Sequence, residues 1–227
     1  MKILKLFGNL TKFEISLWFI SLTVITVSFT VSGGNVLTLI ASLIGATSLI
    51  FLARGFVFGQ VLMIVFCVLY GIISYKFNYY GELLTYAGMT LPMAVVSLIS
   101  WIRHPYKKTA EVEVSKLNAK KVVFIIISSV IVTVIFYFIL KRFNTPNLIP
   151  STVSVLTSYI AATLTAFRTP YYALGYAAND IVVIVLWILA TVTDISYLPT
   201  AICFMTFLVN DLYGFVCWKQ MEKRQQK

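Results

Sequence analysis

The chain of 227 residues has few charged side chains, three cysteines and a single histidine, and each scarcity excludes a class of protein. Only 11% of its residues are charged, against about 25% in soluble domains, whereas 59% are apolar. A compact domain of this size cannot hide so much apolar side chain from water. We therefore expect the lipid bilayer to be its solvent.

The residues that common catalytic and metal sites need are also scarce. Cys67, Cys203 and Cys217 all lie in apolar stretches and form no CxxC pair, so they predict neither a disulfide framework nor a zinc site. His104 lies in a basic loop with no candidate nucleophile beside it, which argues against a hydrolytic triad. The sequence also has no nucleotide-binding glycine loop. We expect a protein that is not an enzyme and that uses no cofactor.

Eight apolar runs are each long enough to cross a bilayer, which takes about 20 residues per helix. Clusters of glycine, asparagine and proline separate the runs, as they do at helix ends. We therefore predict an all-α membrane protein, with a long polar stretch at 103–121 between the fourth and fifth spans. The expected spans are about 13–31, 35–53, 56–75, 82–101, 121–140, 150–167, 171–193 and 199–218.

Positive charge is distributed unevenly between the two sides of this arrangement. The chain has 18 Lys and Arg residues, of which only Lys76, Lys141 and Arg142 fall in the loops of one side. Such asymmetry places the more basic side in the cytoplasm, so both termini are expected there, in a multi-pass protein of the cell membrane. The net charge of +10 then indicates basic loops and contact with anionic lipids rather than a nucleic-acid partner.

The sequence also resembles itself at an offset of 117 residues. The second to fourth spans match the sixth to eighth, and this shift of four spans is even, so both copies of the three-helix unit run in the same direction through the membrane. Parallel repeats of this kind are typical of transporters with a substrate site between the copies. The aromatic residues that coincide are Tyr70 with Trp187, Tyr80 with Tyr197, and Trp101 with Trp218.

These repeats divide the chain into four parts. A peripheral first helix (1–34) precedes the first three-helix repeat (35–103). A basic loop and a linker helix (104–149) then lead to the second repeat with its basic tail (150–227).

Polar groups inside a membrane span are costly, so they are candidates for function. Tyr176, Asp180 and Trp187 are spaced by four and seven residues, which places them on one face of the seventh span. The carboxylate can accept hydrogen bonds from ribose hydroxyls or an amide, and the two aromatic rings can sandwich a flat heteroaromatic ring. The attraction is greater if that ring is cationic. Asn179 points about 100° away, which favours a bridge between helices over ligand contact.

Three further polar residues are candidates for the substrate site. Asn210 shares a face of the eighth span with Gly214, which allows close approach of another helix. Asp211 suits either the substrate site or a structural pair with Arg168, and both interpretations stay open. Gln60 in the third span favours interhelical hydrogen bonding over ligand contact.

The arrangement of motifs resembles the PnuC nicotinamide riboside transporters over nearly the whole chain. The resemblance is carried by FGQVLMIVFCVLYGIISYKFNYYGELLTYAGMTLPMAVVSLISW, a basic loop, RTPYYALGYAANDIVVIVLW and NDLYGFVCW. It implies a SWEET-like core of three, one and three helices, trimeric in at least some members. It also implies facilitated diffusion of a vitamin or nucleoside that cytoplasmic phosphorylation traps.

Carried over by position, the family's site residues fall on Tyr176, Asp180 and Asn210. Tyrosine and aspartate stand where riboside carriers are expected to have tryptophan and asparagine. Leu84 and Ala94 are apolar where polar residues would suit a riboside. The substrate therefore stays open among nicotinamide riboside, a deoxyribonucleoside, thiamine and riboflavin.

The function expected from these features is facilitative import of nicotinamide riboside or a related nucleoside or vitamin. We expect alternating access, with uptake driven by a cytoplasmic kinase, and ion coupling stays open. The first alternative is a substrate-binding membrane subunit of an ATPase-driven transporter. The second is a membrane enzyme acting on a phospholipid headgroup, which would need clustered acidic residues for a metal.

Overall fold

The computed structural model describes residues 10–32, 35–76 and 80–226, without the side chains of residues 80–82 and 108. Eight helical segments in this part of the chain are long and apolar enough to cross a membrane, as the sequence predicts. They are α2 (Lys12–Val31), α3 (Val36–Ala53), α4 (Val57–Lys76), α5 with α6 (Tyr80–Thr85 and Leu91–Arg103), α7 (Ala119–Arg142), α8 (Leu148–Ala166), α9 (Tyr172–Thr193) and α10 (Leu198–Gln225).

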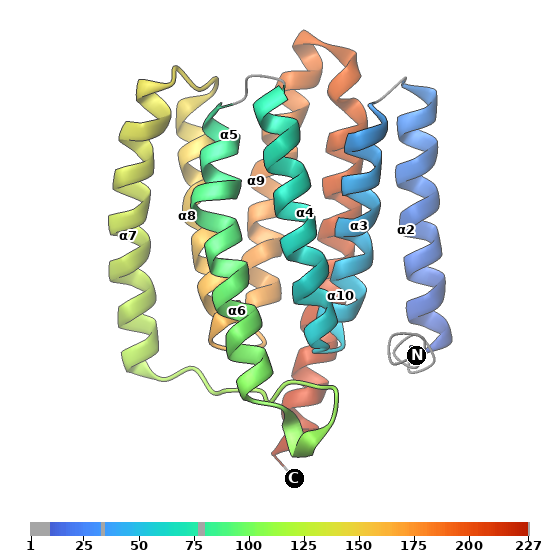
Figure 1. Cartoon of the computed structure of the whole chain (residues 1–227), viewed down its shortest axis with the longest axis vertical. Helices are drawn as coiled ribbons and strands as arrows, with labels where there is room; N and C mark the ends of the chain where they lie inside the picture. The colour runs from blue at the N-terminus through green and yellow to red at the C-terminus, as the bar shows by residue number, and fades with distance from the viewer. Residues whose placement is uncertain (1–9, 33–34, 77–79, 227) are drawn as a thin grey trace.

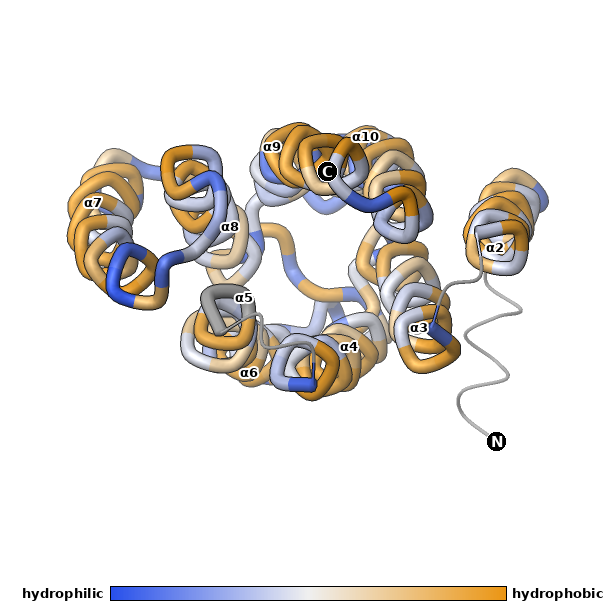
Figure 2. Tube along the Cα trace, turned by 90° about the horizontal axis from the view of Figure 1, so that it is seen from above, coloured by the Kyte–Doolittle hydropathy of each residue, from blue (hydrophilic) through white to orange (hydrophobic). Residues whose placement is uncertain are grey.

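Six of these segments form a ring, seen end-on in Figure 2. Around it, α3 packs on α4, α4 on α6, α6 on α8, α8 on α9, α9 on α10, and α10 again on α3. The first repeat supplies α3 to α6 and the second α8 to α10, so the α6–α8 and α10–α3 contacts are the two seams between repeats. Helices α2 and α7 lie outside the ring on opposite sides (Figures 1 and 2). The expected core of three, one and three helices with a peripheral first helix is confirmed.

Two spans differ in detail from the expectation. The fourth is interrupted by a π turn, η1 (Tyr86–Thr90), which joins α5 to α6. The Leu91 N–H donates to the carbonyl of Tyr86, and we attribute this wider turn to Pro92, which has no N–H to donate. The last span continues to Gln225 instead of ending near 218, and Gln225 at its end binds the backbone of the loop between α6 and α7.

Equivalent tryptophans join the two seams. The Trp101 indole N–H of α6 donates to the carbonyl of Thr165 at the end of α8 (3.0 Å). The Trp218 indole N–H of α10 donates to the carbonyl of Leu52 at the end of α3 (2.8 Å). Both rings are fully buried, and their centroids lie 5.3 Å apart. Each repeat therefore donates the same hydrogen bond to the other, as expected for residues that coincide in the repeat register. The side chain of Tyr80, which the register pairs with Tyr197, lies outside the described part.

The loop between α6 and α7 crosses one end of the ring, and we call residues 104–118 the strap (Figure 1). The Val112 N–H donates to the carbonyl of Gly55 (2.9 Å), and the Ser115 N–H donates to the carbonyl of Arg168 (2.9 Å). Gly55 and Arg168 follow the ends of α3 and α8, and both have left-handed φ angles, +66° and +58°. The strap therefore binds the same helix-end turn in both repeats.

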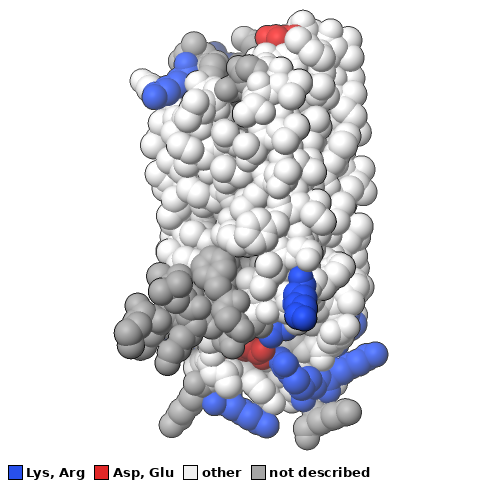
Figure 3. All heavy atoms as spheres, turned by 90° about the vertical axis from the view of Figure 1, so that its right-hand side faces the viewer, with Lys and Arg blue, Asp and Glu red and all other residues white. Residues whose placement is uncertain are grey.

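The strap marks what we call the basic end of the bundle. Helix α2 begins there and α10 ends there (Figure 1). Most of the Lys and Arg side chains visible in Figure 3 also gather at this end. Gln225, at the end of α10, accepts a hydrogen bond from the Val114 N–H and donates one to the carbonyl of Val112.

We predict that Trp101→Phe and Trp218→Phe each lower the melting temperature in detergent. Each change removes an indole donor, worth about 0.5–1.5 kcal/mol, and leaves a gap in a buried seam. The matched control is Trp18→Phe on peripheral α2, where a half-buried indole donates to the hydroxyl of Thr47. A thermal melt in which the seam variants lose no more stability than Trp18→Phe would contradict this role.

Candidate functional site

Two carboxyl groups meet inside the ring, on the neighbouring helices α9 and α10. Asp180 and Asp211 lie within hydrogen-bonding range of each other, and their side chains are 3% and 4% exposed. Tyr176, one turn from Asp180 on α9, approaches both carboxyls and has its hydroxyl within hydrogen-bonding range of Thr165. The structure therefore brings together Asp180, Asp211 and Tyr176, three of the residues that the sequence indicates.

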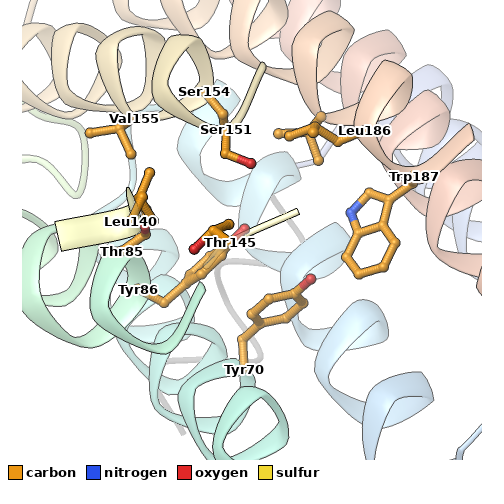
Figure 4. Close-up of a pocket in the computed structure, with 11 residues that line it drawn as sticks. Tyr70, Thr85, Tyr86, Leu140, Thr145, Ser151, Ser154, Val155, Leu186 and Trp187 are labelled. Carbon is orange, nitrogen blue, oxygen red and sulfur yellow. The ribbon is translucent and has the colours of Figure 1, made fainter. Parts of the chain in front are cut away.

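Trp187 lies about 10 Å further along α9, because it is seven residues away at a rise of 1.5 Å per residue. It lines a cavity of about 50 Å³ together with Tyr70 of α4 and Tyr86 of η1 (Figure 4). The ring centroids of these two tyrosines are 4.3 Å apart. Four aliphatic residues and four hydroxyl residues also line it, the latter being Thr85, Thr145, Ser151 and Ser154. We call this cavity the aromatic pocket.

Sequence reasoning left Tyr70 and Tyr86 out of the candidate site. The repeat register contained a signal for one of them, because Tyr70 coincides with Trp187 at the offset of 117 residues. In the structure these two equivalent residues line the same pocket (Figure 4). Residues at equivalent positions of two repeats face one another when an axis of pseudo-symmetry passes between them.

The interior of the ring is closed at the basic end. The Trp101 and Trp218 rings meet there, and Tyr172 packs edge-on against Trp218 with its ring centroid 4.9 Å away. The strap crosses the same end. The carboxyl pair on α9 and α10 therefore lies between a closed basic end and an aromatic pocket toward the opposite end.

Asn179 lies in the interface between α8 and α9. Its carbonyl oxygen accepts hydrogen bonds from Thr157 (2.9 Å), Ser158 (2.9 Å) and Ser154 (3.3 Å), all on α8. This geometry matches the bridge between helices that its direction on α9 favours.

Asn210 contacts a helix outside the ring, and Gln60 is buried on α4. The Asn210 amide donates to the Ser21 hydroxyl of peripheral α2 (3.0 Å) and to the carbonyl of Thr206 (2.8 Å). It therefore ties α10 to a helix outside the ring. Gln60 is 2% exposed, and its amide nitrogen has no hydrogen-bond partner in the described part of the chain.

Arg168 has partners other than Asp211. Its guanidinium donates to the Ser100 hydroxyl (2.7 Å) and the carbonyl of Glu113 (3.2 Å), and lies 3.0 Å from the imidazole of His104. Burial lowers the pKa of Arg168 from its ordinary value, and the nearby Glu113 carboxylate opposes this shift. Of the two interpretations of Asp211, the structure therefore disfavours the pair with Arg168. It assigns Arg168 to the closure of the basic end.

Comparison with known proteins relates this architecture to a family. The family model described as nicotinamide mononucleotide transporter matches residues 35–220. A protein named nicotinamide riboside transporter PnuC, from Neisseria mucosa, is 25% identical over 226 residues, which cover 97% of this chain and 86% of that protein. The crystal structure of a protein described as the vitamin B3 transporter PnuC shares the fold, with a TM-score of 0.82 and 24% identity over 96% of this chain and 95% of that one.

These relatives are named as transporters, in agreement with the expectation that the chain is not an enzyme. Because the family model spans most of the chain, this protein is a multi-pass membrane protein that belongs to the PnuC family of transporters.

Proposed function

We propose that this protein imports nicotinamide riboside, or a closely related nucleoside or vitamin, across the cell membrane. The observation that carries the proposal is the buried Asp180–Asp211 pair, which lies beside Tyr176 and has Asp180 on the same helix as Trp187. Carboxyl oxygens bind ribose hydroxyls or an amide, and the aromatic residues stack on a flat base. The name of the curated relative from Neisseria mucosa supports the riboside as the first substrate to test.

Transport by alternating access fits a ring built from two repeats. The aromatic pocket of about 50 Å³ has room for a few water molecules, so a nucleoside enters only if the helices around it separate. Release at the basic end then requires that the Trp101–Trp218 contact open and that the strap release at least one repeat. We propose these as the two gates of the cycle.

We further propose that the basic end faces the cytoplasm and that a cytoplasmic kinase drives net uptake by phosphorylating the imported substrate. The charge asymmetry of the loops supports this orientation. Homotrimer formation stays a prediction. The alternative of a binding subunit for a separate ATPase is distinguished by transport in liposomes that contain this chain alone.

Proteoliposomes that contain only this protein should equilibrate nicotinamide riboside and accumulate it no further, because no energy source is coupled. Measuring internal substrate against time, with empty liposomes as the control, tests this. No uptake at all would favour the ATPase-dependent alternative. Accumulation above the external concentration in a proton gradient would contradict facilitated diffusion.

Asp180→Ala and Trp187→Ala should each weaken substrate binding by about tenfold or more. Removing a buried hydrogen-bond partner costs about 1–3 kcal/mol and losing an aromatic stack about 0.5–1.5 kcal/mol, and about 1.4 kcal/mol is tenfold. Val185→Ala is the matched control, because that side chain is exposed on the lipid-facing side of the same helix. Wild-type affinity in a monodisperse Asp180→Ala protein would remove Asp180 from the site.

Reporter fusions should place both the strap and the end of the chain at Lys227 in the cytoplasm. The reason is the concentration of Lys and Arg on that side of the predicted topology. A reporter of the kind that works only outside the cytoplasm is fused at each position as well. Activity of that reporter at either position would contradict the orientation.

A further inference from the structure

The Asp180–Asp211 pair places two carboxyl groups together inside the ring with no positive charge beside them. In the part of the chain that the structure describes, the only charged group acting on Asp180 is Asp211, and the reverse also holds. The pair also lies near the neutral side chains of Tyr172, Tyr176 and Cys203. Two ionised carboxylates at this distance repel strongly in a medium of low dielectric constant, so one proton is held between them.

A pair that shares one proton still carries one negative charge. Asp180 is 97% buried, and its Oδ2 atom accepts a hydrogen bond from no donor among the described residues. A buried charge without a partner is strongly destabilising, above all within a membrane. The pair with its open oxygen therefore favours a ligand that brings a positive charge and a hydrogen-bond donor.

The aromatic residues along the same helix fit a cation of a particular shape. Tyr176 lies next to the carboxyl pair, and the aromatic pocket with Trp187, Tyr70 and Tyr86 lies two turns further along α9. Aromatic faces stack on flat rings, and they attract cations through the ring quadrupole. A planar ring that is itself cationic uses both interactions and also balances the charge of the pair.

We propose that Asp180 and Asp211 hold one resident proton and select a planar organic cation, such as an N-ribosylated pyridinium ring, over a neutral nucleoside of the same shape. This inference rests on the proposed function and deepens it, because it names the charge of the substrate. The proton stays on the pair, and the single negative charge faces the cationic ring.

The test compares two ligands that differ in charge and little in shape. Nicotinamide riboside carries a positive pyridinium ring, whereas its 1,4-dihydro form has the same heavy atoms and is neutral. Calorimetry on the purified full chain in detergent should show that the cation binds at least about tenfold more tightly than the neutral form. This ratio corresponds to a difference in binding free energy of about 1.4 kcal/mol. Equal affinity for the two forms would overturn the inference. Binding of neither form would instead overturn the proposed function, and the inference with it.

Asparagine variants test the shared proton, because an amide has the shape of a protonated carboxyl and no charge. Asp180→Asn and Asp211→Asn each leave one carboxylate, so each should weaken binding of both ligands and keep the ratio of their affinities within about threefold. The double variant should lose the ratio. Glu14→Gln is the matched control, since Glu14 is a buried carboxyl on α2, outside the ring, and should leave the ratio unchanged. A ratio lost in both single variants would mean that the remaining carboxyl is neutral, and would contradict a pair that keeps one negative charge.

A measurement on the wild-type protein covers the case in which a variant does not fold. Binding of the cation is followed in buffers of different ionisation enthalpy, which reports the number of protons released. A resident proton predicts no release. Release of about one proton per bound cation would mean that the proton leaves the pair on binding, and would overturn the resident proton.

Discussion

The hydrogen bond that each repeat donates to a helix end of the other repeat is the interaction on which the ring depends. The last carbonyl groups of a helix have no partner within that helix, and the bilayer offers no water to supply one. Here the carbonyls of Leu52 and Thr165 each accept a bond from the backbone N–H three residues later and a further bond from a tryptophan of the opposite repeat. The seams are thus fixed at two helix ends, where the carbonyl has room for a second donor.

The same constraint explains why the basic end is closed more firmly than the opposite end. The turns after α3 and α8 direct their carbonyls to the strap, whose backbone N–H groups satisfy them at Gly55 and Arg168. Gln225 binds the strap from α10, and Arg168 binds it through the carbonyl of Glu113. Opening this end exposes several backbone groups at once, whereas the aromatic pocket is lined mostly by rings and hydroxyls that tolerate water.

The sequence predicts the fold well because the bilayer imposes long apolar runs, and the runs are directly visible. The charge asymmetry and the aromatic register are also visible in the sequence. Trp101 and Trp218, which coincide in that register, make equivalent hydrogen bonds in the structure. The π turn before Pro92 and the continuation of α10 to Gln225 are not predicted, since the first depends on how the helix accommodates Pro92 and the second on contacts with the strap. These features follow from tertiary structure rather than from periodicity.

The candidate site was less predictable, because helix periodicity tells which residues share a face and not which neighbouring helix that face meets. Asp180 and Trp187 share a face of α9, yet Asp180 meets Asp211 of α10 while Trp187 meets the aromatic pocket. Adjacent residues of α10 also separate, since Asn210 contacts peripheral α2 and Asp211 turns into the ring. The distances between helices, which no single sequence specifies, decide each of these outcomes.

The two repeats share their scaffold and differ at the site. In the register that pairs Trp101 with Trp218, Asp180 corresponds to Met63 and Asp211 to Ala94, so the first repeat has no carboxyl pair. Both carboxyls lie on α9 and α10, two helices of one repeat that pack directly against each other. In the proposed transport cycle, these two helices move as a unit when a seam between repeats opens, so a substrate bound to the pair keeps its partners while the access to it changes. Concentrating the charged contacts in one repeat is therefore compatible with the two proposed gates, because neither gate has to separate Asp180 from Asp211.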